Sequence, residues 1–330
     1  MVELNGKKIL VTFLMHLGDL TLTTPFIHAL RKAAPDAHIT MLVDEKLKDV
    51  VLFNPYLDEV VTIDKKGRDN SILSLWACSR HLSKLDFDVL INLHPNERCS
   101  FIDAMTSVKL RTGTTHKIFK WFWDVFTPLD RSMHAADMYL DVLQQLGVQN
   151  LSNNGLEIFP GEEHFLEAEL FWQEQNITDQ DKLIGFNIGS AVPTKRWPPE
   201  RFAEVADIFA AKGYKTVFFG GPMDEEMVAE ATGYMQTRPI IATGHFAIGG
   251  LAAAMRRCCL IITNDSGPMH VAISQKVPIV AMYGPSNPKL YGPYTKDAVI
   301  VTAQPPCQGC ADGMKHSCDD LQCMSRMTVE

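Results

Sequence analysis

The sequence predicts an α/β protein of two doubly wound, Rossmann-like domains that face a central cleft. Apolar stretches of strand length alternate with stretches of helical spacing, which is the pattern of a parallel sheet. A chain of 330 residues is long for one core and suits two such domains. Each half also opens alike, with a charged pair, Lys7-Lys8 or Asp181-Lys182, before an apolar strand. Ligands of such sheets bind where the strands end, so the loops there are the candidate site.

The first half supplies one set of alternating elements. Pro25 stands at the start of a helical stretch, where its missing N–H does no harm. The expected strands cover residues 9–14, 38–43, 59–63, 88–93 and 108–112, and the expected helices cover residues 24–33 and 72–82.

The second half repeats the alternation after a stretch rich in loop residues at 151–162. Because Asn153-Asn154-Gly155 and Pro160-Gly161 are loop signals, we expect domains at 1–160 and 161–330. The expected helices cover residues 165–175, 199–212 and 270–275, and the expected strands cover residues 183–188, 215–219, 239–242, 258–263 and 278–283.

Composition and charge narrow the class of protein. No apolar run reaches the ~18 residues of a membrane span. The N-terminus lacks the layout of a signal peptide, which predicts a cytoplasmic protein that can still touch a membrane surface. The net charge of −8 argues against a broad nucleic-acid surface.

The first strand-end loop, Met15 to Leu20, carries a candidate general base. A hydroxyl is a poor nucleophile until its proton is removed, and Asp19 is placed to accept that proton. His16 is a second candidate, and Gly18 eases the turn. The alternative is that Asp19 only caps the next helix.

The second loop is basic and hydroxylated. Lys195 and Arg196 can neutralise a diphosphate leaving group, which is the work that Mg²⁺ does elsewhere. Ser190 and Thr194 can donate hydrogen bonds to the phosphate oxygens. No acidic cluster competes for a metal, so none is expected. The alternative is that the two basic side chains are simply solvated.

The third loop follows the strand at 215–219. A carboxylate of Asp224 or Glu225 could hold ribose hydroxyls, as acids at strand ends do in nucleotide folds. Helix capping by Asp224 is the alternative. Backbone amides at Thr243-Gly244, one strand later, could read an adenine edge.

The fourth loop is the most informative stretch, with Asp265, Ser266 and Gly267 between an apolar strand and a helix. Free N–H groups at a helix N-terminus attract phosphate, and glycine lets it approach. Asp265 would repel phosphate but suits a neutral hydroxylated group such as a sugar, which points to a nucleotide sugar. His270 is within reach of the phosphate or the sugar, or is simply packed. The alternative is a Ser-Gly turn that caps the helix.

These loops, in this order, resemble glycosyltransferase family 9, the ADP-heptose:lipopolysaccharide heptosyltransferases. The resemblance spans about residues 8–290. The matching stretches are Leu17-Gly18-Asp19, Thr23-Thr24-Pro25, Leu30-Arg31, Thr194 to Pro198, Phe202-Ala203-Glu204, Asn264 to His270 and Ala281 to Pro285.

The resemblance implies a GT-B fold and an inverting, metal-independent transfer of heptose from ADP-heptose, with no cofactor. By position, Asp19 is the catalytic base, Lys195 lies at the phosphates and Asp265 lies near the heptose hydroxyls. An N-terminal domain would then bind the acceptor and a C-terminal domain the donor. The expected donor-binding residues are Gly18, Ser190, Thr194, Asp224, Glu225, Thr243, Gly244, Asp265, Ser266, Gly267 and His270.

The implied acceptor is the anionic inner core of lipopolysaccharide, reached from the inner face of the inner membrane. The aromatic run from Phe119 to Phe126 is expected to pack in a core or between domains, with a membrane surface as the alternative. The candidate acceptor contacts are His16, Arg98, Arg111, Lys117 and Lys120.

Four cysteines near the C-terminus, Cys307, Cys310, Cys318 and Cys323, have a spacing that permits structural zinc. The gap between the second and third is short for a two-knuckle site, so free thiols or packing are favoured over zinc or a disulfide.

Three rival functions remain at this stage. A transferase of the same fold could use another nucleotide sugar, since fold does not fix substrate. A non-catalytic nucleotide-sugar binder is weakened by the presence of Asp19 beside Lys195. An NAD-dependent oxidoreductase is weakened by the missing GxGxxG.

Overall fold

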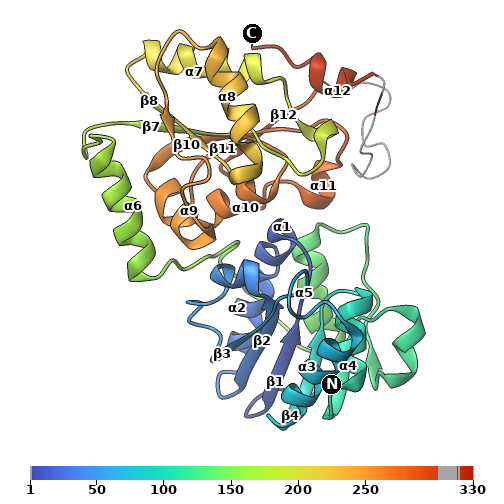
Figure 1. Ribbon diagram of the computed structural model, residues 1–330. Coiled ribbons are helices and arrows are strands. Elements are labelled where there is room, and N and C mark those ends of the chain that lie inside the picture. The colour runs from blue at the N-terminus through green and yellow to red at the C-terminus, as the bar shows by residue number, and fades with distance from the viewer. Residues whose placement is uncertain (1, 304–317, 319, 330) are drawn as a thin grey trace. The chain divides into compact units, whose positions relative to one another are not determined.

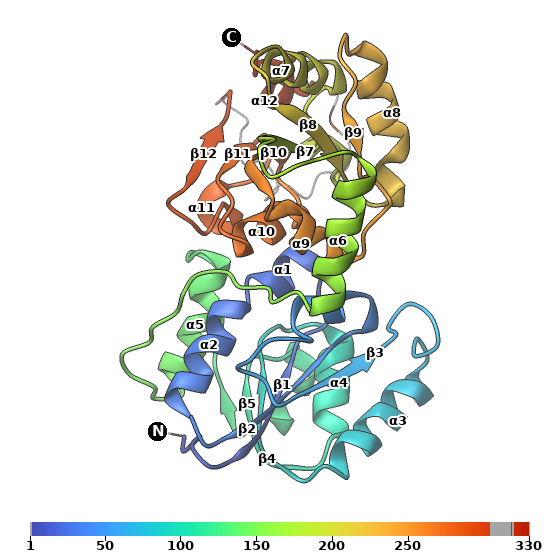
Figure 2. The same ribbon diagram turned by 90° about the vertical axis from the view of Figure 1, so that its left-hand side faces the viewer.

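The protein consists of two compact units, Met1–Phe159 and Pro160–Glu330. The computed structural model describes residues 2–303, 318 and 320–329. Each unit is a parallel six-stranded sheet with helices on both faces, as Figures 1 and 2 show, so the Rossmann-like fold class predicted from the sequence is confirmed. Within the described ranges, none of the helices combines the length and the apolar character of a membrane span.

The sheet of the N-terminal unit has the strand order β3-β2-β1-β4-β5-β6. Neighbouring strands are parallel throughout, with Leu10 paired to Thr40 on one side and to Leu90 on the other. The strands are β1 (Lys8–Thr12), β2 (His38–Asp44), β3 (Glu59–Ile63), β4 (Phe87–Asn92), β5 (Val108–Gly113) and β6 (Val125–Phe126).

Helices cover both faces of this sheet. In Figure 2, α2 and α5 lie on one face, while α3 and α4 lie side by side on the other. The α-helices are α1 (Leu17–Thr21), α2 (Thr24–Ala33), α3 (Ile72–Ser83), α4 (Glu97–Met105) and α5 (Ala135–Gln145), and the 3-10 helices are η1 (Glu45–Val50) and η2 (Lys117–Phe122).

The sheet of the C-terminal unit has the order β12-β11-β10-β7-β8-β9, again with all neighbours parallel. Counted from the first strand of each unit, this is the same order as in the N-terminal sheet. The strands are β7 (Leu183–Asn187), β8 (Lys215–Phe219), β9 (Ile240–Ile241), β10 (Cys258–Asn264), β11 (Ile279–Met282) and β12 (Ala298–Val301).

Two groups of helices enclose the second sheet. Helices α7 and α8 pack together on one face, and α6, α9 and α10 pack on the other (Figure 2). Phe186, Phe202 and Met324 share the core beneath α7, so the C-terminal segment closes that core. The helices are α6 (Glu162–Glu174), η3 (Pro193–Lys195), α7 (Pro199–Ala211), η4 (Pro222–Asp224), α8 (Glu225–Tyr234), α9 (Ile248–Met255), α10 (Gly267–Ser274), α11 (Pro288–Tyr291) and α12 (Gln322–Ser325).

One buried carboxyl group lies in the core of the N-terminal unit. Asp103 on α4 is fully buried, and the Thr12 hydroxyl at the end of β1 donates to its Oδ2 at 2.9 Å. Burial outweighs the hydrogen bonds from Thr12 and Cys99 and raises the pKa of Asp103 to about 8. The folded protein therefore keeps this group protonated at neutral pH, whereas the unfolded chain ionises it near pH 4.

We expect the stability of the protein to depend on pH through Asp103. Because its folded pKa is the higher one, the folded state holds an extra proton between about pH 4 and pH 8. The contribution of Asp103 to the free energy of unfolding should therefore fall as pH rises from 5 to 8, by at most about 1.4 kcal/mol per pH unit. Because the lowered pKa of His94 has the opposite effect up to about pH 6.5, the Asp103 contribution is read as the difference between the wild type and Asp103→Asn, and urea denaturation should show the wild type losing stability relative to that variant as pH rises. The exposed Asp86→Asn is the control and should follow the wild type; a wild-type profile parallel to that of Asp103→Asn would contradict the expectation.

Candidate active site

The strand order creates one topological switch point in each unit. Connections leave β1 and β4 in opposite directions along the N-terminal sheet, and β7 and β10 do the same in the C-terminal sheet. Loops that leave such a switch point diverge, which opens a ligand site at the carboxyl ends of the strands. Three of the four predicted loops follow β1, β7 and β10, so they lie at these switch points.

In the C-terminal unit the second and fourth loops meet through an ion pair. Lys195 Nζ, at the end of η3, lies 2.8 Å from Asp265 Oδ2, just before α10. The lysine side chain is 16% exposed and the aspartate side chain 7%. The Ser286 hydroxyl donates to the same carboxylate oxygen. The ammonium group is thus held beside the first turn of α10, although sequence reasoning treated the two residues separately.

Ser266 stands at the N-cap position of α10, but its side chain makes no capping hydrogen bond. Its hydroxyl instead accepts from Asn187 Nδ2 at 2.8 Å, and the same amide donates to Thr263 Oγ1. The side-chain cap considered for Ser266 is therefore not formed. Pro268 has no N–H, and the amide of Met269 donates to the carbonyl of Ser266 at 3.2 Å, so Gly267 supplies the amide at the helix N-terminus that suits an anion.

Hydrogen bonds hold the second loop to the fourth loop and to itself. Ser190 Oγ donates to the carbonyl of Asp265 at 3.4 Å, and Arg196 Nε donates to the carbonyl of Ser190 at 2.8 Å. Thr194 is buried. Arg196 therefore supports the loop backbone, which leaves Lys195 as the side chain that faces the α10 terminus.

The two acids of the third loop, Asp224 and Glu225, have different surroundings. Asp224 Oδ2 accepts from the amide of Gly221 at 2.9 Å, and a Cβ added at Gly189 would lie only 2.1 Å from Asp224 Oδ1. The Asp224 carboxylate thus fills the space that glycine leaves open at the end of β7. Glu225 Oε1 lies 2.8 Å from where a Cβ would stand on Gly244, whose φ of +75° suits glycine. Glu225 is the exposed acid of the two, and its side chain lies beside the loop that holds Thr243 and Gly244.

Two buried rings flank this site. His270 lies in α10, one turn beyond Gly267, and is buried. Tyr283, at the end of β11, is also buried, and burial together with the adjacent Asp265 raises its pKa well above the usual range. Its hydroxyl donates to the carbonyl of Tyr291 at 2.9 Å. Tyr283 and Ser286 were not predicted from the sequence, although the stretch that contains Tyr283 was part of the resemblance.

In the N-terminal unit, Asp19 lies in the first turn of α1. The N-cap of that helix is His16, whose side chain makes no capping bond. The alternative role of Asp19 as the cap is therefore wrong by position. Asp19 is half-buried, at the carboxyl end of β1.

A pocket of about 680 Å³ opens at this edge of the N-terminal sheet. It collects side chains from the ends of β1, β3 and β4, and basic residues outnumber its single acid, Glu97. The lining residues are Leu14, Met15, His16, Lys65, Lys66, Asn70, Asn96, Glu97 and Arg98. Such a lining favours an anionic, hydroxylated ligand.

Lys65 fixes the shape of this pocket. Its buried ammonium group donates to the carbonyls of Leu14 and Met15 at 2.9 and 2.7 Å and lies 3.1 Å from Asp44 Oδ2. Arg98 donates to the carbonyl of Lys65 and, at 2.7 Å, to Asn70 Oδ1. The loop that carries His16 and Asp19 is thus tied to the loop after β3. The sequence alone reveals neither the contacts of Lys65 with the first loop nor the link that Arg98 makes to Lys65 and Asn70.

His94, directly after β4, is a further ring at this edge that sequence reasoning missed. Burial, helped by the charges of Arg131 and His16, lowers its pKa to about 4. The His94 ring is therefore neutral at physiological pH. Its centroid lies 6.2 Å from the centroid of the Phe13 ring, in an edge-to-face arrangement.

The predicted acceptor contacts separate into three places. His16 and Arg98 line the pocket at the end of β1. Arg111 donates to the carbonyls of Asp103 and Thr106 at the end of α4, which is a structural role. Lys117 and Lys120 are exposed on η2.

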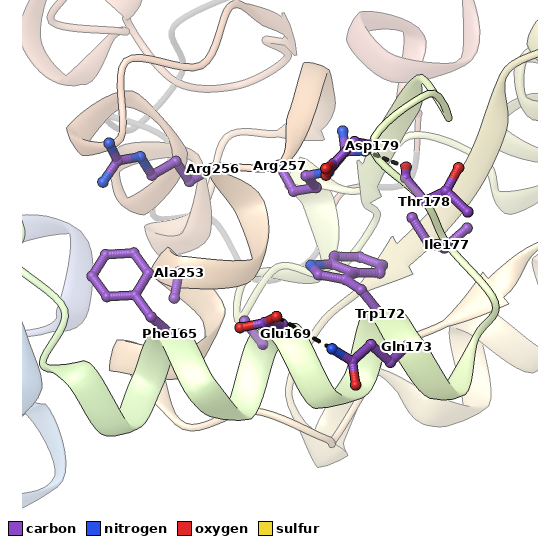
Figure 3. Close-up of a pocket in the computed structure, with 11 residues that line it drawn as sticks. Phe165, Glu169, Trp172, Gln173, Ile177, Thr178, Asp179, Ala253, Arg256 and Arg257 are labelled. Carbon is purple, nitrogen blue, oxygen red and sulfur yellow. Dashed lines mark hydrogen bonds between the residues drawn. The ribbon is translucent and has the colours of Figure 1, made fainter.

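A second pocket, of about 820 Å³, lies in the C-terminal unit between α6 and α9. Figure 3 shows Phe165 and Trp172 of α6 facing Ala253 and the arginines that follow α9. Arg257 donates to the carbonyl of Thr178, before β7. This pocket is therefore at the amino ends of the strands, opposite the four loops, and its two arginines are balanced by two acids.

Two of the four C-terminal cysteines fall among the described residues. Cys307 and Cys310 lie outside the described residues, while Cys318 is exposed and Cys323 is buried in the core beneath α7. In the part of the chain that the structure covers, no three His, Cys, Asp or Glu side chains form a group that could hold a metal.

The sequence matches glycosyltransferase family 9 (heptosyltransferase) over residues 75–318, about three quarters of the chain. The protein belongs to this family. It is thus a glycosyltransferase of the heptosyltransferase family, as the loop motifs predicted. A crystal structure of the glycosyl transferase family 9 from Veillonella parvula DSM 2008 is 53% identical, with a TM-score of 0.95, and the match covers 99% of this chain and 95% of that one.

More distant relatives of this family 9 glycosyltransferase have named substrates. The structure of Escherichia coli ADP-heptose LPS heptosyltransferase II has a TM-score of 0.79 at 22% identity, over 91% of this chain and 92% of that one, and so shares the GT-B fold. Lipopolysaccharide heptosyltransferase 3 of Escherichia coli strain K12 is 24% identical over 297 residues, which are 86% of this chain and 84% of the relative.

Removal of the Lys65 ammonium group should destabilise the N-terminal unit. Lys65→Met would leave Asp44 and two carbonyls without their donor, and breaking a buried ion pair costs about 3–5 kcal/mol. The melting temperature should fall by about 6–20 °C. The matched control is Lys66→Met at the exposed neighbour, which should melt within about 2 °C of the wild type. Equal melting temperatures for the two variants would show that Lys65 does not fix the pocket.

Proposed function

We propose that this enzyme transfers heptose, with inversion, from ADP-L-glycero-D-manno-heptose to the inner core of lipopolysaccharide. The observation that carries the proposal is the Lys195–Asp265 pair beside the α10 terminus. It combines a cation for a diphosphate with a carboxylate for sugar hydroxyls. The donor and acceptor classes are those in the names of the heptosyltransferase relatives.

The C-terminal unit would hold the donor. The ammonium group of Lys195 and the amide of Gly267 at the α10 N-terminus would receive the diphosphate, with Ser190 and Thr194 beside them. Asp265 would accept hydrogen bonds from heptose hydroxyls, and Glu225, which lies against Gly244, would do so for the ribose. Such contacts cost no reorganisation when charge develops on the departing ADP, so they stabilise the transition state more than the bound donor.

The N-terminal unit would hold the acceptor. Its pocket at the end of β1 is basic, which complements an anionic inner core, and Arg98 and His16 line it. Asp19, from the same loop as His16, would take the proton from the acceptor hydroxyl. Donor binding and acceptor binding would thus belong to different units of the chain.

The reaction would be a single displacement. The acceptor hydroxyl loses its proton to the Asp19 carboxylate while its oxygen forms a bond to the anomeric carbon of the heptose. The bond from that carbon to the ADP oxygen breaks on the opposite face, which inverts the configuration. ADP departs with the bonding electron pair, and the Lys195 ammonium group and the N-terminus of α10 at Gly267 stabilise its charge. No step requires a metal or a cofactor.

We expect Asp19→Asn to lower the turnover number by about 10²–10⁴-fold, because general base catalysis contributes on this order. The rate is measured as ADP released from ADP-heptose in the presence of an inner-core acceptor. The donor dissociation constant should stay within about twofold, because Asp19 belongs to the acceptor unit.

His16→Gln is the matched comparison, because both residues lie in the same strand-end loop. A large loss in His16→Gln with little loss in Asp19→Asn would assign the base to His16 instead. Donor binding by the wild type without ADP release on any core acceptor would contradict heptosyl transfer itself.

A further inference from the structure

Large apolar side chains are exposed at the start of α3. Leu73 is 79% exposed and Ile72 is 72% exposed, and Trp76 follows one turn later with much of its ring in solvent. The same helix buries Leu75 and Leu82 against the sheet, so its exposed apolar face is additional to the one that packs. A helix that only covers a sheet needs no such second face.

A second exposed group lies on η2. Trp121 is 95% exposed, and Ile118 and Phe122 are also exposed. The expectation that the aromatic run packs in a core is right for Trp123, which is buried and donates to the carbonyl of Thr112, but wrong for Trp121.

The base of η2 is firmly attached. The Phe119 ring meets the Phe101 ring of α4 at 6.2 Å, and the amide of His116 donates to Ser100 Oγ at 2.9 Å. The exposed side chains are therefore presented on a fixed support rather than on a loose loop.

The two groups flank the same part of α4. Arg98, in the first turn of α4, donates to Asn70 just before α3, and Phe101 on the next turn contacts η2. In Figure 2, α3 and α4 lie together on one face of the N-terminal sheet. The group on α3 follows the carboxyl end of β3, and the group on η2 follows the carboxyl end of β5. The basic pocket lies at the same edge of this sheet. We call Ile72, Leu73, Trp76, Ile118, Trp121 and Phe122 the apolar rim.

Unpaired positive charge accompanies the apolar rim. Lys66, Lys117 and Lys120 have no carboxylate within ion-pair distance among the residues that the structure describes. Lys120 rests over the Phe126 ring at 4.3 Å. The chain as a whole carries −8, so this local excess runs against its average.

The acids near the apolar rim are already engaged. Asp69 pairs with Arg68, Glu97 lies 3.7 Å from His116, and Asp124 accepts from the amide of Arg111. Arg80 lies over the Trp76 ring, so it adds a further positive charge to the α3 side.

We propose that the apolar rim is a membrane-docking surface that enters the headgroup region of an anionic phospholipid bilayer. Tryptophan and lysine alternating on a rigid support suit that region, since the rings enter the acyl boundary while the ammonium groups reach the phosphates. Exposed apolar side chains also occur on α6, at Leu166 and Leu170, but Glu162, Glu163, Glu167 and Glu169 surround them and would repel the same surface. The charge pattern thus selects the N-terminal rim.

Docking through this rim would bring the basic pocket to the bilayer. The pocket residue Asn70 is two positions before Ile72, and Arg98 links α4 to it. An acceptor anchored in the bilayer would then meet the pocket without leaving the surface. The docking itself does not depend on which sugar the enzyme transfers, so it can be tested without substrate.

The test is sedimentation of the full chain with vesicles that contain phosphatidylglycerol and with vesicles of phosphatidylcholine alone. The wild type should bind the anionic vesicles. Trp76→Ala combined with Trp121→Ala should weaken that binding at least about tenfold, because two rings leave the interface. Lys117→Gln combined with Lys120→Gln should weaken it by about fivefold or more for anionic vesicles only.

Leu170→Ala is the control, because it removes a half-exposed apolar side chain from an acidic helix and should bind as the wild type does. All these side chains are on the surface, so melting temperatures should be unchanged and binding can be read directly. Two results would overturn the proposal: no binding of the wild type to anionic vesicles, or equal binding by the double tryptophan variant. A wild-type dimer in sedimentation velocity that the double tryptophan variant abolishes would assign the rim to a second copy of the chain instead.

Discussion

Parallel pairing in a fixed strand order is the constraint on which the rest of this structure depends. In both sheets the first and fourth strands of the unit are neighbours, and the chain leaves them in opposite directions. Every loop after a strand must therefore come to one edge of its sheet, and the loops at the switch point must diverge. This places Asp19 and the basic pocket at one carboxyl edge and Lys195, Asp265 and the α10 terminus at the other. The chemistry follows from this placement, because Lys195 and Asp265 lie far apart in the sequence and meet only where β7 and β10 end.

A lysine fixes the loops in each unit, but the two lysines are used differently. Lys65 spends all of its donors on two carbonyls and Asp44, so it is a structural clamp that has no hydrogen left for a ligand. Lys195 meets one carboxylate, and that carboxylate also accepts from Ser286. The Asp265 carboxylate therefore positions the Lys195 ammonium group at the helix N-terminus. The remaining N–H groups of Lys195 can then donate to a diphosphate. The number of hydrogen-bond acceptors around each ammonium group therefore distinguishes the supporting cation from the one proposed to act.

Much of the fold could be predicted because apolar strands bounded by glycine and proline stand out, and the expected strands match observed ones to within a few residues. Helix α4 could not be predicted, because Ser100 and Asp103 are buried on it and hide its apolar period. The four loops could be found from strand ends, yet the pairing of Lys195 with Asp265 could not, since only the sheet brings them together. The role of Lys65 was hidden for a similar reason: beside Lys66 it reads as one more solvated lysine, and only the fold shows that it is buried.

The most direct test of this account is the affinity for ADP, measured by titration calorimetry in the presence of EDTA. Lys195→Gln should bind ADP about 10–100-fold more weakly than the wild type, because a charge-assisted contact is lost and Asp265 is left uncompensated. Lys212→Gln, at the end of α7, is the control and should bind as the wild type does. Equal affinity of Lys195→Gln and the wild type would contradict the claim that these loops hold the diphosphate.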